Sequence, residues 1–263
     1  VGSEMCIRDR ASKWVKEDHR TIEELETNMI EFTTAFAKKF NKEPTVKWMD
    51  VVNETILPNG KWFGPKKGTN KWENPWLKIG LDDNGCPLYI LKAFEIATKY
   101  ATNIKLVYNH NAGMESFMWD KVKETILYIR SKGYRVDGIG WQAHIGLSAS
   151  TKAILENTDE ELRKLSDLID WAHKNNLEFH ITELDYFVKD NNKLSEEHQK
   201  QAEIYAKIVN ILREKIKSGV VTLNFWDMAV RTKKGKEGAF HSIYDSDFKP
   251  TPAYKAINLL SKN

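Results

Sequence analysis

The sequence predicts an α/β fold, and within that class an incomplete (β/α)8 TIM barrel. Segments with strand character and segments with helical periodicity take turns along the chain, and such alternation packs as a parallel sheet covered by its crossover helices. An open nucleotide-binding sheet would normally carry a Gly-rich phosphate loop after its first strand, and neither GxGxxG nor GxxxxGK[ST] occurs. A barrel of this size, 263 residues, is usually one domain, so we expect a single one.

The first predicted helix covers residues 22–40. Thr21 and Glu24 have the spacing of a capping box, and apolar residues then recur at intervals of three and four. Pro44 closes the segment because a proline lacks the N–H that a continuing helix needs. We therefore expect an amphipathic helix at this position.

A short β-rich run at residues 46–52 predicts the first strand, which ends in the polar pair Asn53 and Glu54. Residues 55–86 then show neither helical nor strand period and read as a long ordered loop. This loop contains four large aromatic residues: Trp62, Phe63, Trp72 and Trp76. They could extend a ligand-binding face, but burial in a small core of the loop itself is the favoured interpretation. Pro87 marks the start of the second helix.

The rest of the chain repeats the alternation. Further strands are predicted at residues 104–108, 136–142, 178–182 and 220–226, and further helices at 116–132, 158–175, 195–218 and 252–260. That makes five strands, whereas a closed barrel needs eight, so we expect the first three to belong upstream of residue 1. Residues 1–19 fit no periodic pattern and are expected to be non-native or disordered, which leaves residues 20–263 as the catalytic domain.

Composition excludes several classes of function. The 40 basic and 37 acidic residues leave a net charge of +3, which is too small to imply a nucleic-acid or anionic-membrane partner. No apolar run is long enough to span a bilayer, and the charged N-terminus lacks the apolar core of a secretory signal. Cys6 and Cys86 match no metal or redox spacing. We expect a monomer.

Polar residues gather where the predicted strands end, and in a parallel barrel the carboxyl ends of the strands carry the active site. The pairs are Asn53 and Glu54, Asn109 and His110, Gln142 and His144, Glu183 and Asp185, and Trp226 and Asp227. Any one pair could equally cap a helix or solvate a loop, but five such pairs at one edge favour a site.

Two carboxylates that face one cleft are what cleavage of a glycosidic bond requires. One protonates the leaving oxygen while the other meets the developing oxocarbenium ion, and retention of configuration needs a gap of about 5 to 5.5 Å between them. Glu54 and Glu183 fit these positions. Mutual repulsion and partial burial would keep one of them protonated near neutral pH and the other ionised, and the pattern alone does not say which.

Two motifs make the resemblance to a known family specific. WMDVVNE at residues 48–54 resembles the acid/base strand of glycoside hydrolase family 10, and ITELD at 181–185 resembles its nucleophile strand. Three further stretches are similar to that family in the same order: YNHN at 108–111, GIGWQAH at 138–144 and DSDFKPTPAYKAI at 245–257. The resemblance covers roughly residues 20–261. It implies a (β/α)8 barrel, endo-acting hydrolysis of β-1,4-xylan with retention, and no metal or organic cofactor.

The resemblance also implies a role for each matching residue. Glu54 is the implied acid/base and Glu183 the implied nucleophile, with His144 hydrogen-bonded to Glu183 and Asp185 orienting the imidazole. The implied sugar-binding residues are Asn53, Asn109, Gln142 and Trp226. His110 stands where the family usually has Asp, so a role tied to that carboxylate does not carry over.

The sequence departs from the family in two places. The upstream Trp-His segment that grips sugars on the non-reducing side is absent, and NFWDMAVRT replaces the usual stretch of strand eight, which loses its second tryptophan. Arg231 and Lys233 near that stretch suggest a pocket for chains that carry acidic uronosyl groups.

Two alternatives stay open beside a xylanase. One is another retaining β-1,4-glycanase, such as a cellulase or mannanase, against which the strand with Gln142 and His144 argues. The other is an inactive fragment that binds xylan without cutting it, which the absence of the upstream segment favours and the intact Glu54 and Glu183 oppose. Because polysaccharides are met outside the cytoplasm, we expect a secreted or periplasmic parent protein.

Overall fold

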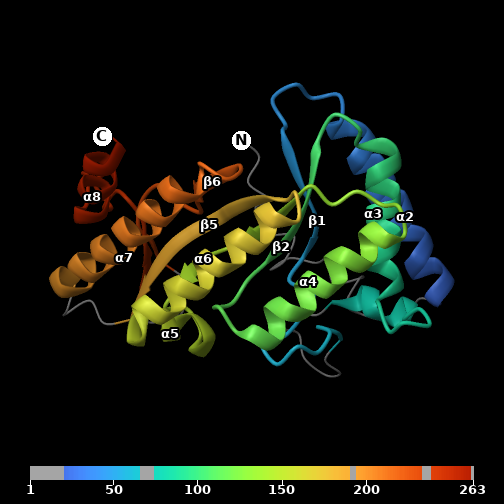
Figure 1. The fold of residues 1–263 in the computed structure, drawn as a ribbon, viewed down its shortest axis with the longest axis horizontal. Coiled ribbons are helices and arrows are strands. Elements are labelled where there is room, and N and C mark those ends of the chain that lie inside the picture. Colours follow the sequence, from blue (N-terminus) through green and yellow to red (C-terminus); the bar gives the residue numbers. More distant parts are fainter. Residues whose placement is uncertain (1–20, 66–73, 190–193, 233–237, 262–263) are drawn as a thin grey trace. The chain divides into compact units, whose positions relative to one another are not determined.

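The computed structural model describes residues 21–65, 74–189, 194–232 and 238–261, which form two compact units. The first unit holds residues 1–110 and 116–138, and the second holds 111–115 and 139–263. Figure 1 shows the elements of both, and each unit is described by itself. The predicted segment 1–19 lies outside the described residues, as do Trp72 and Lys233.

The first unit builds one βαβ step and its flanking helices. Its elements are α2 (Ile22–Phe40), β1 (Trp48–Asn53), the 3-10 helix η2 (Pro75–Ile79), α3 (Leu88–Tyr100), β2 (Lys105–His110) and α4 (Ser116–Ser131). β1 and β2 pair in parallel, from Trp48 opposite Lys105 to Asn53 opposite Asn109, and α3 is the crossover between them. Because the strands are parallel and in this register, the two asparagines end up side by side at the carboxyl edge.

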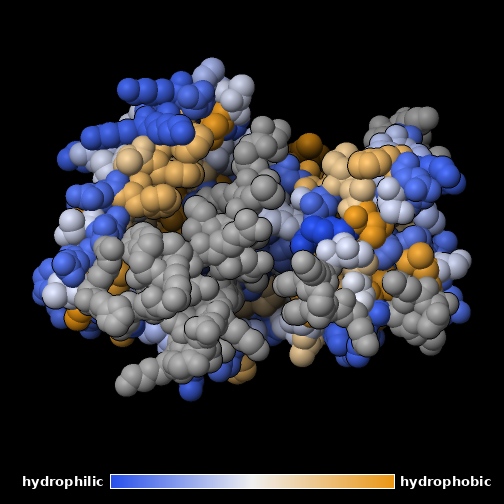
Figure 2. All heavy atoms as spheres, turned by 180° about the vertical axis from the view of Figure 1, so that it is seen from behind, coloured by the Kyte–Doolittle hydropathy of each residue, from blue (hydrophilic) through white to orange (hydrophobic). Residues whose placement is uncertain are grey.

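Helix α2 starts with the capping box that the sequence predicts. The Glu24 N–H donates to the Thr21 hydroxyl (3.2 Å), and the Thr21 N–H donates to the Glu24 carboxylate (3.0 Å). Leu25 and Met29 are buried, whereas Phe32 is 56% exposed. Figure 2 shows hydrophobic residues lying at the surface among hydrophilic ones. The predicted apolar stripe is thus only partly buried.

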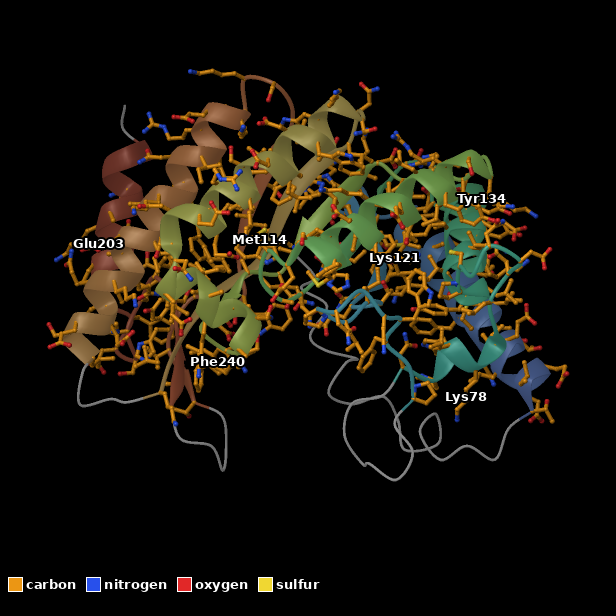
Figure 3. All side chains as sticks on the ribbon, turned by 60° about the horizontal axis from the view of Figure 1, so that its bottom comes forward. Lys78, Met114, Lys121, Tyr134, Glu203 and Phe240 are labelled. Atoms are coloured by element: carbon orange, nitrogen blue, oxygen red, sulfur yellow. The ribbon has the colours of Figure 1, made fainter. Side chains whose placement is uncertain are left out.

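The loop at residues 55–86 packs on itself where it is described. Phe63 is buried, and the half-buried Trp62 donates its indole N–H to the Gly85 carbonyl (2.9 Å). Lys121 of α4, labelled in Figure 3, lies with its ammonium 5.3 Å from the Trp62 ring. These contacts favour the small loop core over a sugar-binding face for Trp62 and Phe63.

The second unit is centred on one long strand. Its elements are β3 (Gly138–Trp141), β4 (His144–Ile145), α5 (Ala149–Glu156), α6 (Thr158–Lys174), β5 (Glu178–Val188), α7 (Leu194–Lys215), β6 (Val221–Phe225), β7 (Arg231–Thr232), β8 (Ala239–His241) and α8 (Pro252–Ser261). β4 and β6 pair with β5 in parallel, and β3 is its neighbour in the sheet. Helices α6 and α7 pack along β5 (Figure 1).

All five predicted strands are present, as β1, β2, β3, β5 and β6, but the structure departs from the prediction around β5. β5 ends at Val188 instead of residue 182, because its last residues pair antiparallel with β8. The short strands β4, β7 and β8 and the helix α5 were not predicted. The three strands have two or three residues each and the helix has eight, so periodicity carries little signal for them.

The strands β3 and β5 are covered on both faces and form much of the buried core of the second unit. β3 is buried throughout, and eight of the eleven residues of β5 are buried. Near-continuous burial is expected for parallel strands whose two faces are both covered. β6 is an exception, since four of its residues are half-buried and Asn224 is exposed. Among the described residues, no helix is long and apolar enough to cross a membrane.

Candidate active site

Glu54 sits directly after β1 in an uncommon backbone conformation. Its φ is +55° and its side chain is buried, with 2% of the residue exposed. Its N–H donates to the carbonyl of Asn109 at 3.3 Å, so the strand-end residue of β2 helps to hold this turn. A left-handed conformation costs about 1 to 2 kcal/mol for a residue other than glycine. Such strain persists where the surroundings enforce it, which is common at functional sites.

The segment that follows Glu54 is tied down by side chains of β2. The buried His110 accepts a hydrogen bond at Nε2 from the N–H of Ile56 (3.1 Å), and its ring meets Trp119 edge-on with centroids 5.9 Å apart. The hydroxyls of Thr55 and Tyr108 also form a short hydrogen bond. His110 therefore helps to hold the segment after Glu54 in place. It stands where the family that the sequence resembles usually has Asp.

His144 lies between two carboxylates in the second unit. Its Nδ1 is 2.8 Å from Oδ1 of Asp185, and its Nε2 is 3.2 Å from Oε2 of Glu183. β5 supplies both acidic residues two positions apart, hence from one face of the strand, and β4 places His144 opposite Asp185. Asp185 is fully buried, and Glu183 and His144 are each 9% exposed. The structure thus brings together three of the predicted site residues.

These contacts decide which groups of the site are charged. Burial by itself would lower the pKa of His144, but the hydrogen bonds and charges of Asp185 and Glu183 outweigh it and raise that pKa to about 9. Burial raises the pKa of Asp185, and the hydrogen bond from His144 and the charge of Arg231 oppose the rise. At neutral pH the ring is consequently an imidazolium that donates to a carboxylate from each nitrogen.

Gln142 and Trp226 flank this group. Gln142 is fully buried at the end of β3, and the next residue, Ala143, has a φ of +62°. This turn separates β3 from β4 and lets both Gln142 and His144 remain at the strand ends. Trp226 follows β6, is half-buried, and meets His144 edge-on with ring centroids 6.0 Å apart at 85°. Both residues belong to the predicted sugar-binding set.

The predicted residues therefore form two groups. Asn53, Glu54 and Asn109 belong to the first unit, and the group around His144, which includes Gln142, Glu183, Asp185 and Trp226, belongs to the second. The predicted gap of about 5 to 5.5 Å between the two glutamates joins these units and stays a prediction.

The sequence did not reveal that Arg231, on β7, lies close to Asp185. Its Nε donates to a carboxylate oxygen of Asp227, its guanidinium carbon lies 4.4 Å from the centre of the Phe240 ring, and its Nη2 is 3.7 Å from Oδ2 of Asp185. The predicted pocket for uronosyl groups has not been tested. The only trace of this arrangement in the sequence is the spacing of four residues between Asp227 and Arg231.

His180, three residues before Glu183, is a buried histidine of the core. Its Nδ1 lies 2.9 Å from the hydroxyl of Thr222 on β6. Burial lowers its pKa to about 4, so the ring is neutral at ordinary pH. Among the described residues, no three His, Cys, Asp or Glu side chains are arranged to hold a metal ion.

The chain is similar to known glycosyl hydrolases. The family model of glycosyl hydrolase family 10 matches residues 4–259. An endo-1,4-beta-xylanase A of Thermoanaerobacterium saccharolyticum is 27% identical over 90% of this chain, and an exoglucanase XynX of Acetivibrio thermocellus is 28% identical over 90%. The chain spans only 18% and 19% of the lengths of these two curated relatives.

A solved structure extends the likeness to three dimensions. The native xylanase 10B of Thermotoga maritima superimposes with a TM-score of 0.72 at 25% identity, covering 97% of this chain and 72% of that one. The predicted fold class, a (β/α)8 barrel present in part, is thereby confirmed. The family match begins at residue 4, and the predicted domain boundary between residues 19 and 20 stays a prediction.

Proposed function

Because the chain belongs to glycosyl hydrolase family 10, we propose that it is a retaining endo-β-1,4-xylanase with Glu54 as acid/base and Glu183 as nucleophile. The observation that carries this proposal is the position of His144 between Glu183 and Asp185, at 3.2 and 2.8 Å. An imidazolium that donates to Glu183 holds one rotamer of that carboxylate and places a positive charge beside the attacking oxygen.

In the first step, a carboxylate oxygen of Glu183 attacks the anomeric carbon of a xylosyl unit. The glycosidic bond breaks, and Glu54, as the carboxylic acid, gives its proton to the departing oxygen. The products are a sugar with a free hydroxyl and a glycosyl ester on Glu183. His144 remains protonated throughout and fixes the attacking oxygen.

In the second step, the roles of the acid/base residue reverse. The Glu54 carboxylate takes a proton from water as the water oxygen attacks the same carbon, and the ester bond to Glu183 breaks. Glu54 ends protonated and Glu183 ends ionised, so the site returns to its starting state. Two inversions give net retention of configuration.

The remaining site residues are assigned to the sugar. Asn53 and Gln142 are the proposed hydrogen-bond donors to the hydroxyl beside the reacting carbon, where such bonds strengthen in the transition state. Asn109, opposite Asn53 in the strand register, is proposed to contact the sugar too. The half-buried Trp226 is proposed to stack on a sugar face.

A second candidate keeps the chemistry and changes the polymer. One relative is named an exoglucanase, which supports a β-1,4-glucan as the alternative substrate. Xylan is preferred because a curated relative and a solved structure are both named xylanases, whereas the exoglucanase matches no larger share of this chain. The protein is further proposed to act as a monomer, without metal or cofactor, and outside the cytoplasm, where its polymeric substrate lies.

The test compares two substrates and three variants. Glu183→Ala should reduce kcat on both xylan and an aryl β-xylobioside by roughly four to six orders of magnitude, because no other group can form the ester. Glu54→Ala should lose about 10²- to 10⁴-fold on xylan but much less on the aryl glycoside, whose leaving group needs no proton. Glu214→Ala removes an exposed carboxylate of α7 and serves as the control.

Three outcomes would contradict the proposal. Equal losses for Glu54→Ala on both substrates would remove that residue as the acid. Full activity in Glu183→Ala would remove the nucleophile. Binding of xylan without turnover by the unsubstituted chain would favour the non-catalytic alternative.

A further inference from the structure

The buried carboxylate of Asp185 has only one hydrogen-bond partner in the described part of the chain. Oδ1 accepts from His144, whereas Oδ2 is buried without a hydrogen-bond partner. A buried ionised carboxylate is unfavourable unless other charges or hydrogen bonds compensate for the lost water. The second oxygen of Asp185 therefore needs a compensating positive charge.

Arg231 supplies that charge and is held in place by two other contacts. Its Nη2 lies 3.7 Å from Oδ2 of Asp185, while Nε is bonded to Asp227 and the planar face rests on Phe240. Phe240, labelled in Figure 3, lies on β8, which pairs with both β5 and β7. A guanidinium can stack and donate at its edge at the same time, which a lysine cannot do.

We propose that Arg231 is a positioning residue of the active site, which keeps the shared proton on His144 instead of Asp185 and so makes Glu183 face an imidazolium. The catalytic part of this role rests on the proposed function of the chain. Arg231 acts through Asp185 and His144, so no contact with the substrate is needed. Because Asp227 and Asp185 lie beside the guanidinium, Arg231 should attract an acidic sugar less strongly than an unpaired arginine would.

The proton shared by Asp185 and His144 can occupy either of two positions. In one state Asp185 is a carboxylate and His144 is charged, and in the other Asp185 is an acid and His144 is neutral. The positive charge of Arg231 favours the first state because Arg231 lies beside Asp185 and reaches His144 only through Asp185. Removing Arg231 shifts the balance toward the second state, in which Glu183 still receives a hydrogen bond but loses the neighbouring positive charge.

Every charged or titratable neighbour of Asp185 enters this balance. His144 comes from β4, Glu183 from β5 and Arg231 from β7, and the buried phenol of Tyr205 faces Asp185 from α7. Burial and the charge of Asp185 raise the pKa of Tyr205, so this phenol stays neutral and does not replace Arg231. Asp227 partly offsets the guanidinium charge, so we expect an effect of moderate size.

An NMR titration of the ring nitrogens tests the proposal without any need for turnover. The chain has seven histidines, and the signals of His144 are identified by their loss in His144→Gln. Arg231→Met should lower the midpoint of the His144 titration by about 0.5 to 1 unit, less than the 1 to 3 units of a direct charged partner. Arg231→Gln, which can still bond to Asp227, should give the same shift.

The matched control is Arg163→Met, since Arg163 is an exposed arginine of α6 that is also paired with two carboxylates. It should leave the His144 midpoint unchanged. In the pH profile of kcat/KM on the aryl β-xylobioside, the acidic limb should move to higher pH in Arg231→Met and stay in place in Arg163→Met.

An unchanged His144 midpoint in both Arg231 variants overturns the proposal whatever their activity. An equal shift in Arg163→Met overturns it too, since it would show an effect of net charge only. Absence of turnover in the unsubstituted chain would instead contradict the proposed function and leave the titration result standing.

Discussion

At the scale of single residues, the site depends on how one imidazole is charged. His144 contacts a carboxylate at each nitrogen, and both contacts lie in a region from which water is largely excluded. A hydrogen bond between charged partners is stronger there than in water. The contacts that we propose to orient Glu183 for attack therefore also contribute to the stability of the fold.

The activity of a His144→Gln variant follows from this geometry. The amide can hydrogen-bond to one carboxylate but carries no charge, so Glu183 loses part of its orientation. We expect kcat to fall by up to about 100-fold, as for a small misplacement of a reacting group, and not by the factor expected for loss of the nucleophile. Steady-state kinetics on the aryl β-xylobioside would check this, and an unaltered kcat would show that the contact has no function in turnover.

The raised pKa of His144 also predicts how stability depends on pH. Its value is about 9 in the folded chain against 6.5 ordinarily, so between these values the folded state binds a proton that the unfolded state has lost. The stabilisation is fully present below about pH 6.5 and disappears as the pH rises through 9. One pKa unit corresponds to about 1.4 kcal/mol, so the loss is at most about 3 kcal/mol.

Denaturant unfolding at pH 6 and pH 9.5 measures this loss. The unsubstituted chain should lose more stability than His144→Gln between the two conditions, because only the former releases the proton. Equal losses in the two proteins would contradict the charged state of His144.

The residues of the site differ in how well the sequence foretold them. Glu54, Glu183, His144 and Asp185 could be named because their motifs resemble a family, and the contacts of the last three are present in the structure. Arg231 was assigned to a substrate pocket, since nothing in a sequence shows that a side chain from β7 reaches a carboxylate on β5. Such pairs depend on the folded arrangement of strands.

At the scale of elements, β8 links β5 to the short strand that carries Arg231. Residues 186–188 of β5 pair antiparallel with β8, which in turn pairs with β7. Gly238 precedes β8 with a φ of +95°, and a Cβ there would lie 2.5 Å from the Val188 carbonyl oxygen. The hairpin therefore needs glycine both for its backbone conformation and for space.

A comparison of two glycine substitutions tests this requirement. Gly238→Ala adds a clash to the strain of a left-handed backbone, whereas Gly133→Ala, at a φ of +82° with nothing within 4 Å, adds strain alone. We expect Gly133→Ala to cost about 1 to 2 kcal/mol and Gly238→Ala at least about 1 kcal/mol more. Thermal and denaturant unfolding measure both, and equal costs would show that the close approach at Gly238 can relax freely.

A second element-scale prediction concerns the contact between α7 and β8 in acid. Nε2 of His198 and Nδ1 of His241 lie 2.9 Å apart, and burial with the neighbouring ring lowers the pKa of His241 to about 4. Burial likewise lowers the pKa of His198, against the charge of Asp245. The unfolded state thus binds more protons between pH 6.5 and 4, and stability falls as the pH falls through that range.

His241→Gln should flatten this acid branch by up to about 3 kcal/mol between pH 6.5 and 4. Together with the loss through His144 in alkali, the stability of the unsubstituted chain should be greatest near pH 6.5. An acid branch that is equally steep in His241→Gln would exclude the histidine pair as its cause.

The elements themselves were predictable in proportion to their length. The helices at residues 22–40, 116–132 and 195–218 appear within a few residues of the expected bounds, because an amphipathic period over many residues is a strong local signal. β8 has three residues and α5 has eight, and neither is long enough for such a signal. The extension of β5 depends on β8 and was missed with it.

At the scale of the whole molecule, the proposed reaction requires residues from both units. Glu54 belongs to the first and Glu183 to the second, and double displacement needs both at one anomeric carbon. The fold class was predictable from the alternation of strands and helices, and the family from motifs in a fixed order. The distance between the two carboxylates was predicted only from the chemistry of retention, and it stays a prediction.

The most direct test of the central claim is to trap the covalent intermediate on the chain. Incubation with an activated 2-deoxy-2-fluoro-β-xylobioside, followed by mass spectrometry of the peptides, should place the label on the peptide that contains Glu183. The label should be absent in Glu183→Ala, and it should turn over slowly in the unsubstituted protein. A label on a different carboxylate, or substrate cleavage with inversion and no label, would contradict the account.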